Sequence, residues 1–233
     1  MKKINIYLDG PNYDQIKKSL KNKEIKGYTF NPSLFKKLNV KNYLSACIKF
    51  AKLVYPKPIS LEVFADNEEE IFQQALILSK VAQNVEVKIP ISYTNGKSTK
   101  GVIKRLVNEN INLNLTAIFS ISQIQKVFSE IKNTKTILSV FAGRIHDMGL
   151  DASKEIKKIS KMLKKNKSKC RLLWASTRQI YDLILAEKCG CKIITISPSI
   201  YSKKINFKRN WKEYSLSTVK DFYTDAKKSN FTI

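Results

Sequence analysis

Short apolar segments alternate along this chain with longer segments in which apolar residues recur at helical spacing. Eight of the short segments are rich in β-branched, leucine and aromatic residues, and several are almost continuously apolar, which is typical of strands covered on both faces. These predicted strands are residues 4–9, 27–30, 59–64, 85–91, 112–119, 136–141, 171–176 and 192–197.

The intervening segments carry helix signals. Residues 66–82 start at Asp66 with three glutamates close behind, and residues 151–165 start at Asp151 and end in lysines, as the charges at helix ends favour. Residues 178–189 precede Gly190, a common C-terminal stop, and residues 215–229 have apolar residues at helical spacing.

Eight strands alternating with helices predict a (β/α)8 TIM-type barrel. A doubly wound open sheet is the alternative, but no Gly-x-Gly-x-x-Gly motif follows the first strand, so a Rossmann nucleotide site is unsupported. We expect one barrel domain over residues 1–233, with a C-terminal helical tail from about residue 201.

Composition narrows the class of protein. The chain has 233 residues, of which 43% are hydrophobic, enough for one sizeable core. Four cysteines do not make a disulfide scaffold, no apolar run is long enough to span a membrane, and the N-terminus lacks the features of a signal peptide. We expect a soluble cytoplasmic protein with reduced thiols and no membrane partner.

The net charge of +24 invites a nucleic-acid interpretation. Only five of the 43 basic residues are arginines, however, and the lysines are spread over the whole chain. Nucleic-acid sites favour the bidentate guanidinium. We therefore expect no nucleic-acid partner, whereas small anionic substrates suit the charge.

The active site of such a barrel lies at the C-terminal ends of its strands. Several polar residues interrupt the apolar runs, although burying an unpaired polar group costs roughly 1–3 kcal/mol. A set of these converging on one face indicates a site. The residues within or just after the predicted strands are Asp9, Asn31, Glu62, Lys88, Asn114, Thr116, Ser139, Arg144, Ser176 and Arg178.

Lys88 is the most informative of them. A lysine among apolar neighbours loses hydration of its ammonium, which favours the neutral amine. A neutral amine is a nucleophile that forms a Schiff base with a ketone. The structural alternative is a lysine at the barrel rim, paired with Glu62 or Glu86.

The other candidates have structural alternatives as well. Asp9 could cap a helix that starts near residue 11, and Arg144 and Arg178, which suit a phosphate, could form surface ion pairs. His146 is the only histidine and is expected in a loop. Cys189 and Cys191 resemble half of a metal site without a second pair, so we expect no metal. Trp174 and Phe141 are expected in the core.

Seven segments together resemble the transaldolase family, including its short members related to fructose-6-phosphate aldolase. They occur in the family's order and are residues 8–10 (LDG), 27–33 (GYTFNPS), 61–63 (LEV), 87–90 (VKIP), 111–116 (INLNLT), 139–145 (SVFAGRI) and 174–178 (WASTR). The resemblance implies a class I aldolase-like barrel without a cofactor.

The resemblance also implies a role for each candidate residue. The imine lysine of the family corresponds to Lys88 and its acid/base aspartate to Asp9, whereas Glu62 and Thr116 match the pair that holds the proton-shuttling water. The residues that match those holding the dihydroxyacetone hydroxyls are Asn31, Asn114 and Ser139, and those that match the phosphate ligands are Arg144, Ser176 and Arg178.

The implied activity is transfer of a dihydroxyacetone unit from fructose 6-phosphate or sedoheptulose 7-phosphate to an aldose phosphate. The aldolase branch has glutamine at the glutamate position, so Glu62 favours the transferase. An aldolase that releases dihydroxyacetone and an inactive barrel used for binding remain alternatives. The family usually has a second threonine where this chain has Phe30. We further expect a role in pentose phosphate metabolism or in the supply of surface-polysaccharide precursors. We also expect a homo-oligomer, and the tail after Tyr201 could cover the site of the same or of a neighbouring subunit.

Overall fold

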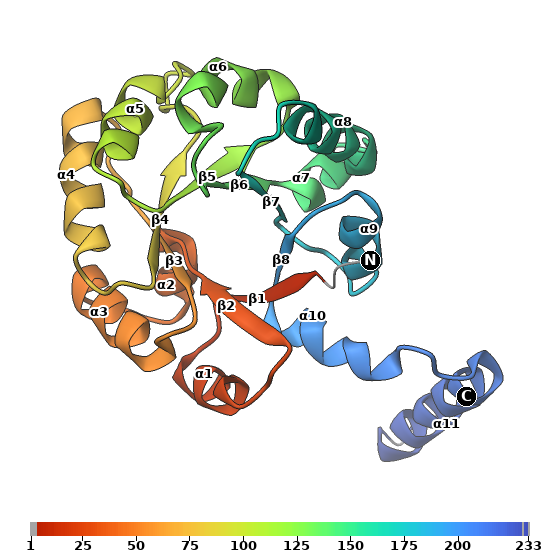
Figure 1. The fold of residues 1–233 in the computed structure, drawn as a ribbon. Coiled ribbons are helices and arrows are strands. Elements are labelled where there is room, and N and C mark those ends of the chain that lie inside the picture. The colour runs from red at the N-terminus through yellow and green to blue at the C-terminus, as the bar shows by residue number, and fades with distance from the viewer. Residues whose placement is uncertain (1–3, 230, 233) are drawn as a thin grey trace. The chain divides into compact units, whose positions relative to one another are not determined.

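The computed structural model describes residues 4–229 and 231–232. The chain divides into two compact units, of which the first ends at Tyr201 and the second begins at Ser202. The first unit is a closed barrel of eight parallel strands, each paired with its neighbours in sequence (Figure 1). The predicted (β/α)8 fold is therefore confirmed.

All eight strands lie where the apolar runs predict them. They are β1 (Asn5–Asp9), β2 (Ile25–Thr29), β3 (Ile59–Glu62), β4 (Val85–Pro90), β5 (Leu113–Ile118), β6 (Ile137–Val140), β7 (Arg171–Trp174) and β8 (Ile193–Ile196). Ten helices lie between residues 13 and 202 of the described chain. They are α1 (Tyr13–Leu20), α2 (Pro32–Lys37), α3 (Tyr43–Val54), α4 (Glu68–Ser79), α5 (Lys100–Asn108), α6 (Ile121–Ile131), α7 (Ala142–Asp147), α8 (Ala152–Lys165), α9 (Asp182–Lys188) and α10 (Pro198–Ser202).

Some predicted helix ends are wrong. α4 is capped by Asn67, whose side chain accepts from the Glu70 amide, because Asp66 instead accepts from the Thr94 amide at 2.8 Å. The helix predicted from residue 178 starts only at Asp182, because the Asp182 carboxylate accepts the backbone N–H of Arg178 before the first turn. α8 is capped by Asp151, as predicted.

The barrel interior contains an apolar cluster, formed by Tyr7, Ile137, Leu173, Ala175 and Ile193. The Tyr7 ring occupies the space beside Gly27, where an added Cβ would lie 2.7 Å from ring atoms. Buried polar side chains of β3, β4 and β5 also lie inside the barrel, among them Ser60, Glu86 and Asn114.

The second unit contains a 3₁₀ helix, η1 (Lys203–Asn206), and α11 (Trp211–Lys228). α11 begins four residues before the predicted start at residue 215, because the Asn210 side chain accepts from the Lys212 and Glu213 amides. None of its residues is buried, and Val219 and Phe222 are 59% and 70% exposed. Among the described residues, the structure contains no helix with the length and apolar character of a membrane span.

Candidate active site

A cavity of about 350 Å³ opens at the C-terminal ends of the strands. Eight of the ten predicted site residues line it: Asp9, Asn31, Lys88, Thr116, Ser139, Arg144, Ser176 and Arg178. The other two lie directly behind this lining, since Glu62 contacts Lys88 and Asn114 contacts Ser139. Barrel closure therefore brings together the whole set, which is spread over 170 residues of sequence.

Lys88 lies on β4 with its side chain inside the barrel and is 5% exposed. The β3–β4 register places Glu62 beside it, and the Lys88 Nζ to Glu62 Oε2 distance is 2.9 Å. Nζ also donates to the Phe30 carbonyl oxygen at 3.2 Å. The ion pair with Glu62, rather than Glu86, is thus present, and it lies at the cavity instead of the solvent-exposed rim.

Asp9 ends β1 and does not cap a helix; Asn12 caps α1 instead. The Thr29 hydroxyl donates to Asp9 Oδ1 at 2.7 Å and lies 2.5 Å from the Thr195 hydroxyl. Burial raises the pKa of the Asp9 carboxyl, against the lowering effects of nearby Lys88 and of the Thr29 hydrogen bond. The site therefore holds a carboxyl group that binds its proton more tightly than an exposed aspartate does.

The cavity floor is formed by buried polar side chains of β5 and β6. The Ser139 hydroxyl donates to Asn114 Oδ1 at 2.6 Å. Thr116 Oγ1 is buried and has no hydrogen-bond partner among the described residues. An unpaired buried hydroxyl is costly in a folded protein, so Thr116 is a group that a ligand or water would satisfy.

Two arginines, Arg144 and Arg178, also line the cavity. Arg178 is paired with Asp147, to which its Nε donates at 3.1 Å, and the Arg144 guanidinium lies 5.2 Å from the centre of the Phe141 ring. Gly143 is required here, because an added Cβ would overlap the Ser176 carbonyl oxygen. Ser176 itself has a positive φ of 60°. The segments after β6 and β7 are therefore in close contact, and each contributes one of the arginines that line the cavity.

The prediction from sequence missed several lining residues and misplaced one side chain. Thr29, Ser33 and Lys37 also line the cavity. Thr29 is the last residue of β2 and could have been found by its position at a strand end, whereas Lys37 is the last residue of α2. Phe141, predicted in the core, is half-buried, packs against the apolar cluster and also lines the cavity, while Trp174 is buried as predicted. His146 lies on α7 rather than in a loop.

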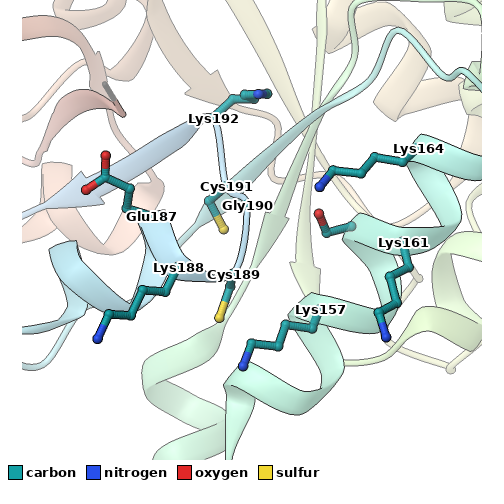
Figure 2. A pocket seen from close by; sticks show the side chains of 10 residues that line it. Lys157, Lys161, Lys164, Glu187, Lys188, Cys189, Gly190, Cys191 and Lys192 are labelled. Carbon is teal, nitrogen blue, oxygen red and sulfur yellow. The ribbon is translucent and has the colours of Figure 1, made fainter. Parts of the chain in front are cut away.

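A second cavity, of about 560 Å³, contains none of the predicted site residues (Figure 2). It lies beside the turn between α9 and β8, at the N-terminal ends of the strands, and its lining includes Cys189, Cys191 and five lysines. Burial raises the pKa of both thiols. Among the residues that the structure describes, no three His, Cys, Asp or Glu side chains group as metal ligands.

An amine, a carboxyl group with a raised pKa, hydroxyls and guanidinium groups thus converge at the C-terminal mouth of a (β/α)8 barrel. That arrangement defines an enzyme site of the lysine-and-carboxylate type. The profile of the family described as Transaldolase/Fructose-6-phosphate aldolase matches residues 6–233. The chain belongs to this family of enzymes.

Individual relatives agree with this assignment. The protein named "Probable transaldolase 2" of Listeria monocytogenes is 31% identical over 200 residues, which are 86% of this chain and 88% of the relative. The "Probable transaldolase" of Bartonella henselae is 29% identical over 84% of this chain and 87% of the relative. That of Leptospira biflexa is 28% identical over 98% of this chain and 100% of the relative, so the similarity extends into the C-terminal unit.

Solved structures with lower sequence identity show the fold alone. Orotidine 5'-monophosphate decarboxylase from Metallosphaera sedula has a TM-score of 0.54 and 12% identity over 85% of this chain and 90% of that chain. Thiamine phosphate pyrophosphorylase from Pyrococcus furiosus has a TM-score of 0.55 and 9% identity over 83% of this chain and 85% of that chain.

Proposed function

We propose that this protein is a transaldolase that carries a dihydroxyacetone unit as an imine on Lys88. The observation that supports it most is the placement of the Lys88 amine, buried on β4, 2.9 Å from Glu62 and in one cavity with Asp9. Family membership supports the same reaction. The donor is fructose 6-phosphate or sedoheptulose 7-phosphate, and the acceptor is an aldose phosphate.

Imine formation is the first stage. Glu62 first accepts a proton from the Lys88 ammonium, and the neutral amine attacks the C2 carbonyl of the ketose. Water then leaves, and Glu62 and the Thr116 hydroxyl orient the water that shuttles protons. The product is a protonated imine, which accepts electrons from the adjacent C3–C4 bond.

Cleavage is the second stage. Asp9 takes the proton of the C4 hydroxyl, the C3–C4 bond breaks, its electron pair moves into the imine as an enamine, and the aldose phosphate leaves. The raised pKa of Asp9 suits proton transfer, which contributes roughly 10²–10⁴-fold to such reactions. The acceptor aldehyde then reacts with the enamine, Asp9 returns the proton, and hydrolysis frees the new ketose and Lys88.

Polar side chains around these groups hold the substrate. Asn31 and Ser139 bind the dihydroxyacetone hydroxyls, Asn114 supports Ser139 from behind the cavity lining, and Arg144, Ser176 and Arg178 bind the phosphate. Because Asn31 Oδ1 accepts the Leu34 amide at 2.8 Å, its Nδ2 is the group that donates to a ligand. When phosphate binds, the Arg178 guanidinium must either leave Asp147 or contact Asp147 and the phosphate at the same time.

Borohydride trapping tests the imine. Incubation with fructose 6-phosphate and borohydride should add the mass of the reduced sugar adduct to the peptide that contains Lys88. Lys37→Met, which changes another lysine of the same cavity, should leave this adduct in place, and Lys88→Met should abolish it. An unmodified Lys88 peptide, beside an active control transaldolase, would refute the proposal.

An aldolase that releases dihydroxyacetone is the second candidate, because the matching family profile includes fructose-6-phosphate aldolase. Measuring the dihydroxyacetone released from fructose 6-phosphate without an acceptor separates an aldolase from a transaldolase. Because Glu62 favours the transferase, we expect little dihydroxyacetone to be released. We further propose a homo-oligomer in the cytoplasm that acts in pentose phosphate metabolism or in supplying polysaccharide precursors. A coupled assay with erythrose 4-phosphate tests the acceptor.

A further inference from the structure

A continuous chain of hydrogen bonds runs from Ser139, which lines the cavity, into the interior of the barrel. The Ser139 hydroxyl lies 2.6 Å from Asn114 Oδ1, Asn114 Nδ2 lies 3.0 Å from Ser60 Oγ, and Ser60 Oγ lies 3.0 Å from Glu86 Oε2. Arg171 Nη2 closes the chain, 2.8 Å from Glu86 Oε1. Five strands contribute one residue each, so the chain connects most of the barrel.

The chemistry of its end groups fixes the direction of this chain. An ionised carboxylate paired with a guanidinium only accepts hydrogen bonds. The Ser60 hydroxyl must therefore donate to Glu86, which leaves the Ser60 oxygen to accept from Asn114 Nδ2. The Asn114 amide is thereby oriented with its oxygen toward Ser139.

The last link has a consequence for the substrate. Because Asn114 Oδ1 only accepts, the Ser139 hydroxyl hydrogen points inward, and the side that Ser139 presents to the cavity is a lone pair. A lone pair binds a hydrogen-bond donor, such as a sugar hydroxyl, and repels a carbonyl or phosphate oxygen. The direction of the chain thus selects the kind of group that Ser139 accepts.

Burial makes this direction difficult to change. Ser60 and Asn114 are 0% exposed, so water cannot replace a lost partner. Glu86 is also buried, and burial raises the pKa of its carboxyl, which the Arg171 guanidinium and the Ser60 hydroxyl oppose only in part. Glu86 precedes Lys88 by two positions on β4 and therefore lies one interior layer below it.

We propose that Ser60 and Glu86 are positioning residues of the reaction centre: they hold Asn114 in one orientation and so fix Ser139 as the acceptor for a hydroxyl of the bound ketone. The inference rests on the proposed function, because the hydroxyl belongs to the ketone that forms the imine on Lys88. Neither residue lines the cavity, and both act through Asn114.

Two ketones that differ only in their hydroxyls test this role. Dihydroxyacetone and acetone are each trapped on Lys88 by borohydride reduction of the imine. The quantity measured is the trapping efficiency of dihydroxyacetone divided by that of acetone. Ser60→Ala keeps the ion pair of Glu86 with Arg171 but cuts the chain, and should lower the ratio roughly tenfold. In Glu86→Gln the side-chain amide can either donate to Ser60 or accept from it, so the direction of the hydrogen bonds is no longer fixed. This variant should therefore lower the ratio as well.

Ser19→Ala is the matched control, because Ser19 is also a buried serine bonded to another side chain, Tyr28, at 2.8 Å. Its ratio should equal that of the wild type. A merely structural role would reduce trapping of both ketones equally, so an unchanged ratio in Ser60→Ala would overturn the inference while the imine stands. Absence of any Lys88 adduct in the wild type would instead refute the proposed function, and this inference with it.

Discussion

Replacing Lys88 by methionine should abolish activity and also destabilise the fold through the partner that it leaves behind. The Glu62 carboxylate, whose side chain is 17% exposed, would lose its contact with Nζ at 2.9 Å. At an effective dielectric constant near 20, the attraction between two charges at this distance is roughly 6 kcal/mol before desolvation is subtracted. Orphaning one member of a buried pair costs about 3–5 kcal/mol, and partial exposure of Glu62 places this case near 3 kcal/mol.

A second substitution separates the orphaned charge from the lost lysine. Lys88→Met combined with Glu62→Leu removes both charges of the pair, and should recover much of the lost free energy of unfolding because the Glu62 carboxylate is no longer left without its partner. Urea unfolding followed by circular dichroism measures both variants. Lys100→Met is the control: Lys100 and Glu130 form a surface pair at 3.6 Å, so its change should be below about 1 kcal/mol.

If the double variant is no more stable than Lys88→Met alone, the electrostatic reasoning is wrong, and the cost comes from packing of the lysine stem instead. If Lys88→Met is as stable as the wild type, the pair contributes nothing to the fold. Neither result would affect the trapping experiment, which depends on the amine and not on stability.

Three further predictions concern Asp9, Gly143 and α11. Because burial raises the pKa of Asp9 above 3.8, the folded protein holds this proton more tightly than the unfolded chain, and the stability from this group falls as pH rises above 3.8. Asp9→Asn should therefore raise the melting temperature at pH 7 and not at pH 3, while lowering the rate of carbon–carbon cleavage at least 100-fold; an unchanged melting temperature at pH 7 contradicts this. Gly143→Ala should destabilise the protein by about 3 kcal/mol through overlap with the Ser176 carbonyl, measured by urea unfolding, whereas Gly101→Ala, whose neighbour is the movable Glu68 side chain, should cost much less. Phe222→Lys should reduce the sedimentation coefficient if the exposed apolar residues of α11 hold copies together, and an identical coefficient would show that they do not.

The local sequence predicted the barrel because each strand is specified by its own residues. Runs such as residues 172–175 are apolar on both faces, and only strands covered on both sides by barrel interior and helices need that pattern. Lys88 and Glu62 stood out because each is a charged residue between apolar neighbours in a predicted strand. Helix starts were less certain, because Asp66 and Asn67 are both good caps and only the contact of Asp66 with Thr94 decides between them.

Sequence by itself therefore determined the order and type of the elements, and which polar residues needed partners. It could not determine which partners they have. The pairing of Lys88 with Glu62, the contact of Thr29 with Asp9, and the chain from Ser139 to Arg171 join residues of different strands. Such contacts depend on the register of neighbouring strands and on closure of the barrel, which are set by packing of the whole core rather than by any short segment.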